Sequence, residues 1–175
     1  MQQQMRRGLV HVYTGNGKGK TTASLGLALR AAGHGLSTVI VQFIKSRECG
    51  EHRALARLSP LIQVLVAGNG FVMDEPSRAD LGCASSALQA ARAVMDGHAC
   101  DLLVLDEVNC AMACGLVGLR EVLELIAARP PEMELVLTGR GALPEVIAKA
   151  DLVTEMKAVK HPFEQGQRAR LGIEY

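Results

Sequence analysis

A short run rich in glycine, lysine and threonine is the part of this sequence best suited to chemistry on phosphate. The run reads Gly15-Asn16-Gly17-Lys18-Gly19-Lys20-Thr21-Thr22. Its glycines let the backbone bend and bring N–H groups close to an anion. Lys20 brings a positive charge to phosphate oxygens, and the Thr21 hydroxyl can bind Mg²⁺. The run therefore predicts a loop that binds the phosphates of a nucleotide.

The run departs at one position from the usual phosphate-loop (P-loop) pattern, G-x-x-x-x-G-K-[ST]. The first glycine of that pattern falls on Thr14, whereas the ending Gly19-Lys20-Thr21 is intact. The run follows a predicted strand and opens a predicted helix, which is the context of a true P-loop. Lys18 is either a solvated loop residue or a further phosphate contact. The predicted nucleotide-binding residues of the loop are Gly15, Asn16, Gly17, Lys18, Gly19, Lys20, Thr21 and Thr22.

An acidic pair, Asp106-Glu107, follows four apolar residues that predict a strand. Ligands of α/β sheets bind at the carboxyl ends of strands, which would place Asp106 near the P-loop. A carboxylate there can hold Mg²⁺ (or Mn²⁺) through its water shell. We predict Thr21, Asp106 and Glu107 as the metal site. The alternative for the acidic pair is a helix N-cap and first turn, and Glu107 suits either role equally.

Other polar residues follow strands at the same predicted edge of the sheet. Arg140 comes after the fifth strand and is either a phosphate contact, through its fork of N–H donors, or a surface arginine. Gln42 and Lys45 end the second strand and face the same way. The five histidines form no ligand cluster along the sequence, so each is interpreted as structural.

Short apolar runs alternate with helical patterns, which predicts an α/β fold with a mainly parallel central sheet and helices on both faces. The predicted strands are Leu9–Tyr13, Thr38–Phe43, Ile62–Val66, Leu102–Leu105, Leu135–Thr138 and Leu152–Thr154. The predicted helices are Lys20–Ala32, a helix capped by Ser77 that runs to about Gly97, one on the stripe of Leu119, Val122, Leu123 and Ile126, and one from Pro144 to about Lys149.

Length and composition restrict the class of protein. The 175 residues suit one domain, 1–175, and the net charge of +1 with no Trp, two Tyr and three Phe argues against a nucleic-acid partner. No apolar run is long enough for a membrane helix, and the first residues do not form a signal peptide. The five cysteines form no CxxC pair, so we expect a cytoplasmic protein without a disulfide framework.

These residues indicate that Mg-ATP is bound, but they do not indicate which bond breaks. A P-loop serves phosphoryl transfer, hydrolysis-driven switching or other reactions on ATP. A second substrate cannot be read from the pattern.

Several sequence blocks, taken in order, resemble the ATP:corrinoid adenosyltransferases of bacterial cobalamin synthesis and salvage. The P-loop run is similar to the unusual P-loop of that family. The other blocks are Val41–Lys45, Val104–Glu107, Leu137–Gly141, Ala150–Glu155, Val159–Phe163 and Gly172–Tyr175. The resemblance covers nearly the whole chain.

The resemblance implies a three-layer, RecA-like P-loop fold and a homodimer. It implies transfer of the 5′-deoxyadenosyl group of ATP to the cobalt of a reduced corrinoid, with release of triphosphate. ATP would lie in the reverse of the usual direction, and Lys20, the loop N–H groups and a metal at Thr21 and Asp106 would meet the leaving group. The corrinoid would be cobalamin, cobinamide or an a,c-diamide precursor, with a flavodoxin-type reductant.

The resemblance also implies a role for the loop before the long helix. Family aromatics in this loop exclude the lower axial ligand of the corrinoid, and Phe71 matches one of them. We therefore predict Phe71, with Lys20, as catalytic; the alternative for Phe71 is simple loop packing. Met73 stands where one branch of the family carries Trp, and the N-terminal segment is shorter than in some relatives.

Two other classes of protein carry the same loop. An ordinary P-loop kinase or regulatory ATPase is the main alternative and would yield ADP. A nucleic-acid motor domain is disfavoured by the near-zero net charge and the few aromatic residues.

Overall fold

The computed structural model describes residues 7–70 and 75–174, and six strands form one sheet in this part of the chain. All five pairs of neighbouring strands are parallel, in the order β3-β2-β4-β5-β1-β6. The strands are β1 (Val10–Thr14), β2 (Thr38–Gln42), β3 (Ile62–Val66), β4 (Leu102–Asp106), β5 (Glu134–Thr138) and β6 (Leu152–Glu155). Because every strand runs the same way, the residues that follow them meet at one edge of the sheet.

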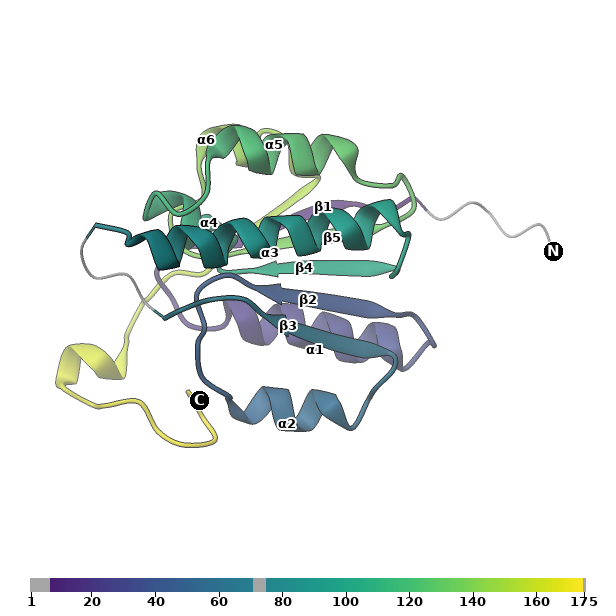
Figure 1. The fold of residues 1–175 in the computed structure, drawn as a ribbon. Helices are drawn as coiled ribbons and strands as arrows, with labels where there is room; N and C mark the ends of the chain where they lie inside the picture. The colour runs from purple at the N-terminus through teal and green to yellow at the C-terminus, as the bar shows by residue number, and fades with distance from the viewer. Residues whose placement is uncertain (1–6, 71–74, 175) are drawn as a thin grey trace.

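Helices cover both faces of this sheet (Figure 1). One face packs against α1 (Lys20–Ala32) and α2 (Gly50–Ala56), through Ala28, Ala31 and Leu55. The opposite face packs against α3 (Arg78–Asp96), α4 (Val108–Ala113), α5 (Leu119–Ala128) and α6 (Pro144–Ile147). The predicted three-layer α/β fold is therefore confirmed.

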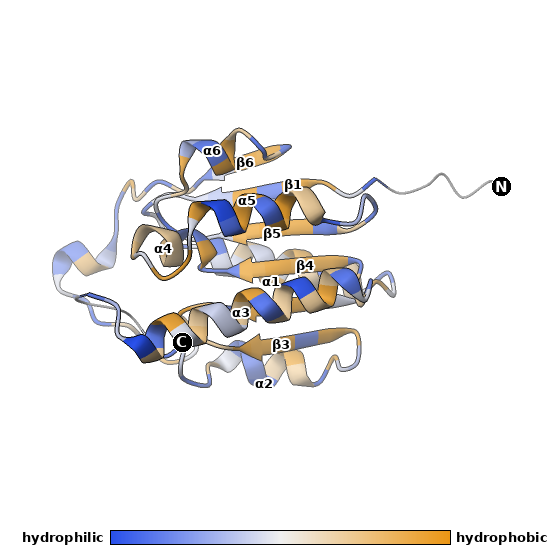
Figure 2. Ribbon diagram, turned by 45° about the horizontal axis from the view of Figure 1, so that its top comes forward, coloured by the Kyte–Doolittle hydropathy of each residue, from blue (hydrophilic) through white to orange (hydrophobic). Residues whose placement is uncertain are grey.

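Strands β4 and β5, in the middle of the sheet, are coloured mainly as hydrophobic residues (Figure 2). Every residue of β2 and of β4 is buried, as expected for strands covered on both faces. The edge strand β6 is exposed along its length. The core thus fixes β2 and β4, which carry Gln42 and Asp106 at their carboxyl ends.

The long helix α3 begins as the sequence predicts. The Ser77 hydroxyl accepts a hydrogen bond from the Asp80 N–H, and the Asp80 carboxylate accepts one from the Ser77 N–H, which forms a capping box. Leu88 and Met95 on this helix are buried, whereas Leu81 near its start is 43% exposed.

Two short helices, α2 and α4, were not predicted, and α6 ends at Ile147 rather than near Lys149. A 3₁₀ turn, Pro162–Gln165, lies in the C-terminal segment, which runs on the side of the sheet where the strands end (Figure 1). Among the helices of the described residues, none combines the length and apolar character needed to cross a bilayer.

Candidate nucleotide and metal site

The P-loop joins the end of β1 to the start of α1. Gly15 has φ 92° and Gly19 has φ 120°, values that side chains with a Cβ rarely adopt. Gly19 is also the N-cap of α1, so the positive end of a 13-residue helix faces the loop. The loop therefore has the backbone conformation and the helix dipole that favour an anion.

Lys20 points back into this loop. Its Nζ donates hydrogen bonds of 2.8 Å to the carbonyl oxygens of Gly15 and Gly17, and the residue is 7% exposed. Burial lowers the pKa of Lys20, and the negative charge of Glu107 opposes that shift. A partly desolvated cation attracts phosphate more strongly than one in water.

The residues after β6 form a wall of the loop that the sequence did not indicate. The Gly17 N–H donates to the Met156 carbonyl at 2.6 Å, and the Met156 N–H donates to the Thr14 carbonyl at 2.8 Å. A Cβ on Gly15 would lie 2.4 Å from the Met156 carbonyl oxygen. Glycine at position 15 thus allows the close approach of a second backbone segment.

Asp106 lies at the centre of a polar network at the ends of β2, β4 and β5. Thr21 and Thr138 each donate a 2.8 Å hydrogen bond to its Oδ1, and Gln42 donates a 3.0 Å bond to its Oδ2. Asp106 is fully buried, so each of these donors compensates for lost water. The structure therefore brings the predicted pair Thr21 and Asp106 together.

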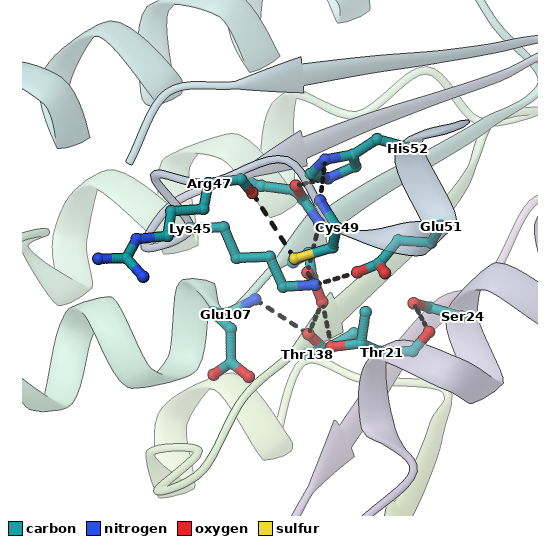
Figure 3. A network of polar contacts seen from close by, with 11 residues as sticks. Thr21, Ser24, Lys45, Arg47, Cys49, Glu51, His52, Glu107 and Thr138 are labelled. Atoms are coloured by element: carbon teal, nitrogen blue, oxygen red, sulfur yellow. Dashed lines mark hydrogen bonds and ion pairs between the residues drawn. The ribbon is translucent and has the colours of Figure 1, made fainter. Parts of the chain in front are cut away.

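Lys45 is the nearest cation to this carboxylate in the described part of the chain. Its Nζ lies 3.9 Å from Asp106 Oδ2 and 2.5 Å from Glu51 Oε1 (Figure 3). Burial lowers the pKa of Lys45. The hydrogen bond with Glu51 and the charge of Asp106 raise it by more than burial lowers it, so the net shift of the pKa is upward. Lys45 is therefore a charged group beside Asp106.

Glu107 is the N-cap of α4 and has left-handed backbone angles, φ 63° and ψ 19°. Its N–H donates to the Thr138 hydroxyl at 2.9 Å. Burial and the charge of Asp106 raise the pKa of its carboxyl group. A strained non-glycine residue beside a buried carboxylate is common at functional sites. Glu107 thus lies near the site and also serves as the helix N-cap that the sequence offered as the alternative.

The remaining predicted site residues lie outside the network around Asp106 or outside the described residues. Lys18 Nζ donates to Glu174 Oε1 at 2.9 Å and to the Ile173 carbonyl, so it contacts the C-terminal segment. Asn16, Thr22 and Arg140 are exposed, and Arg140 lies close enough to Lys20 and Glu107 to affect their pKa values. Phe71 and Met73 lie outside the described residues.

The donor set at Thr21 and Asp106 fits Mg²⁺. Among residues 7–70 and 75–174, no three side chains of His, Cys, Asp or Glu gather closely enough to hold a metal ion. Mg²⁺ needs no such cluster, since it is bound by one or two carboxylates together with substrate phosphates and water. A hydroxyl and a buried carboxylate oxygen 2.8 Å apart, beside a P-loop, match that chemistry.

Comparison with known proteins identifies the family. Residues 6–175 match the family described as ATP:corrinoid adenosyltransferase BtuR/CobO/CobP. The chain belongs to this family. It is 40% identical over 171 residues to the corrinoid adenosyltransferase of Pseudomonas aeruginosa, covering 97% of this chain and 84% of that protein. It is 38% identical over 176 aligned positions to the corrinoid adenosyltransferases of Escherichia coli K12 and Salmonella typhimurium, covering 99% of this chain and 89% of each relative.

Membership in the ATP:corrinoid adenosyltransferase family confirms the resemblance found in the sequence. One contact of the site was not predicted from the sequence. His52 Nε2 lies 2.7 Å from Gln42 Oε1, within the network around Asp106 (Figure 3). The histidines were interpreted as structural, but no partner was predicted for His52, and the short helix that carries it was not predicted. The one available signal was that Gln42 ends a predicted strand and faces the same edge of the sheet as Asp106.

Proposed function

We propose that this protein transfers the 5′-deoxyadenosyl group of ATP to the Co(I) of a reduced corrinoid and releases triphosphate. The family match over residues 6–175 carries the proposal. The P-loop, with Lys20 inside it and Thr21 bonded to Asp106, supports the binding of a triphosphate. In the reaction, the cobalt electron pair forms the Co–C5′ bond, and the C5′–O bond breaks toward the triphosphate.

The residues of the chain act on the leaving group. Lys20 and the N–H groups at the start of α1 stabilise the negative charge that builds on the triphosphate. Bound metal would add Lewis-acid stabilisation of the same phosphate oxygens. Thr21 and Asp106 would hold Mg²⁺ or Mn²⁺, with Glu107 near it. No proton leaves the nucleophile, so the reaction needs no general base.

The remaining contacts with substrates and partners also belong to the proposal. Arg140, on the loop after β5, is exposed and would contact phosphate or the corrinoid. Phe71 would cover the lower face of the corrinoid. We also propose a cytoplasmic homodimer that receives electrons from a flavodoxin-type reductant. Cobalamin, cobinamide and an a,c-diamide precursor are the candidate corrinoids.

The decisive experiment identifies the phosphorus product. The protein is incubated without oxygen with Mg-ATP and chemically reduced cobalamin or cobinamide, and phosphorus NMR and the visible spectrum are recorded. We expect triphosphate and a light-sensitive Co–C absorbance. ADP without a Co–C species would instead indicate a P-loop kinase or ATPase. Lys20→Ala serves as the inactive control, because it should lose turnover under either function.

A further inference from the structure

A hydrogen-bonded chain links Asp106 to a histidine on the opposite side of Gln42. We propose that His52 is a positioning residue, which orients the Asp106 carboxylate through the Gln42 amide. The inference rests on the proposed function, in which Asp106 binds the metal of the nucleotide complex. It concerns two residues, His52 and Gln42, that do not themselves touch metal or substrate.

The tautomer of His52 follows from its neighbour on α2. The Cys49 N–H donates a 3.0 Å hydrogen bond to His52 Nδ1, so Nδ1 must be an acceptor without a proton. The proton of the neutral ring is then on Nε2. That nitrogen lies 2.7 Å from Gln42 Oε1 and donates to it.

This donation fixes the orientation of the Gln42 amide. With Oε1 bound to His52, the amide NH₂ group faces Asp106 and donates to Oδ2 at 3.0 Å. The flipped amide would place an oxygen against a carboxylate oxygen and a nitrogen donor against the His52 N–H. Gln42 is 1% exposed, so water is not available to replace these contacts.

The orientation of Asp106 depends on this donor because its two oxygens have different partners. Oδ1 accepts from Thr21 and Thr138, whereas Oδ2 accepts from Gln42 and lies near Lys45. Loss of the Gln42 donor would leave Oδ2 without a hydrogen bond from a neutral group. Changes in such supporting residues cost metal sites about 10–100-fold in affinity or activity.

His52 is accessible to replacement without disturbing the core. It lines a hollow of about 460 Å³ between α2 and the edge strand β3, together with Arg47, Ala56 and Val64. Its side chain is half-buried, and its hydrogen bonds go to Cys49 and Gln42. A substitution there can therefore change the position of Gln42 while the sheet stays intact.

The test compares two substitutions. His52→Ala removes both the donor to Gln42 and the acceptor for the Cys49 N–H. The side-chain amide of His52→Gln can supply both, because its NH₂ group can donate to Gln42 Oε1 and its oxygen can accept from the N–H of the N-cap residue. Binding of Mn²⁺ in the presence of ATP is measured by electron paramagnetic resonance. We expect the dissociation constant of Mn²⁺ to rise about 10-fold or more in His52→Ala and to stay within about threefold of wild type in His52→Gln.

Several results would overturn the inference. Wild-type affinity in His52→Ala would show that Gln42 needs no orientation, and equal losses in both variants would show that Mn²⁺ binding does not depend on a donor at position 52. Gln42→Met, which cannot donate a hydrogen bond, should weaken Mn²⁺ binding at least as much as His52→Ala. Normal Mn²⁺ binding in Gln42→Met would also contradict the proposed link from His52 through Gln42 to Asp106. The adenosyl-transfer assay on the wild-type protein is a separate test. Failure there, with normal Mn²⁺–ATP binding, would reject the reaction and leave the His52 result valid.

Discussion

The Thr21 hydroxyl donates a 2.8 Å hydrogen bond to Asp106 Oδ1 and so joins two residues 85 positions apart in the chain. Thr21 is the second residue of α1, after the P-loop, and Asp106 ends β4. Strand β5 lies between β1 and β4, and its last residue, Thr138, bonds to the same carboxylate oxygen. The two halves of the candidate site are therefore connected through the end of a third strand.

This contact predicts the effect of changing Thr21. Thr21→Ala removes a hydroxyl that we propose as a metal ligand, so the apparent dissociation constant of Mg²⁺ in the presence of ATP should rise about 10-fold or more. Thr21→Ser keeps the hydroxyl and should stay near wild type. Titration calorimetry of ATP at several Mg²⁺ concentrations measures the change. Equal Mg²⁺ dependence in Thr21→Ala and wild type would contradict a metal at this position.

The glycines of the P-loop and of α1 predict opposite effects of added Cβ atoms. Gly15→Ala places a Cβ 2.4 Å from the Met156 carbonyl oxygen at a φ of 92°, so we expect it to cost about 1–3 kcal/mol of stability. Gly26→Ala is the matched control, because its Cβ would meet no atom within 4 Å in the middle of α1. It should stabilise the protein by about 0.5–1 kcal/mol.

Urea unfolding followed by circular dichroism measures both glycine variants. ATP binding should weaken in Gly15→Ala and stay unchanged in Gly26→Ala. A fully stable Gly15→Ala would mean that the segment after β6 does not pack against the P-loop as described.

The sequence predicted the parts of the site that local patterns encode. Lys20 and Thr21 belong to a fixed spacing of glycine, lysine and threonine between a strand and a helix, and Asp106 follows a continuous apolar run. All three could therefore be placed at the carboxyl edge of the sheet. The contacts of Gln42 could not be predicted in this way. They depend on which strands lie side by side, and the order β2-β4-β5-β1 does not follow the order in the chain.

Two α-helices, α2 and α4, were not predicted from the sequence, for different physical reasons. Helix α2 has seven residues, begins with Gly50 and buries only Leu55, so it presents no apolar stripe. Helix α4 has six residues and follows directly from β4 through the left-handed Glu107. Six residues are too few to show the period of a helix. Tertiary packing, rather than local preference, defines both helices.

The ion pair of Lys18 predicts a competition between ATP and the C-terminal segment. Glu174 lies 2.9 Å from Lys18, so Glu174→Gln leaves Lys18 without its carboxylate partner. An exposed ion pair of this kind is weak, so the KM for ATP should fall by no more than about fivefold. Steady-state kinetics measure this change.

Glu164→Gln is the control for the same segment, because Glu164 is exposed in the 3₁₀ turn. It should leave the KM for ATP unchanged. If Glu174→Gln also leaves it unchanged, Lys18 is not a phosphate contact, and its assignment as a nucleotide-binding residue is wrong.

Cys110 on α4 provides a pH-dependent prediction. Burial, followed by the negative charge of Glu107, raises the pKa of Cys110 to about 11. The thiol form therefore dominates at neutral pH, and since the thiolate is the nucleophile, alkylation should be slow at pH 7 and accelerate as the pH rises toward 11. Glu107→Gln removes one cause of the shift and should make alkylation faster at a given pH.

Peptide-level mass spectrometry after brief iodoacetamide treatment measures the rate at each pH. Cys100 provides a comparison, because burial also raises its pKa to about 11 without a contribution from Glu107. Its rate should not change in Glu107→Gln. Rapid alkylation of Cys110 at neutral pH would contradict its placement on α4.

The bond from the Gly17 N–H to the Met156 carbonyl assigns a structural task to the last strand of the sheet. The P-loop occurs early in the sequence, but its shape is completed only when β6 and the residues after it have been synthesised and have docked beside β1. A growing chain that ends before residue 156 would carry every glycine of the motif and still lack the backbone that supports it. Competence to bind ATP should therefore appear late in synthesis, once the end of the chain has folded against its beginning.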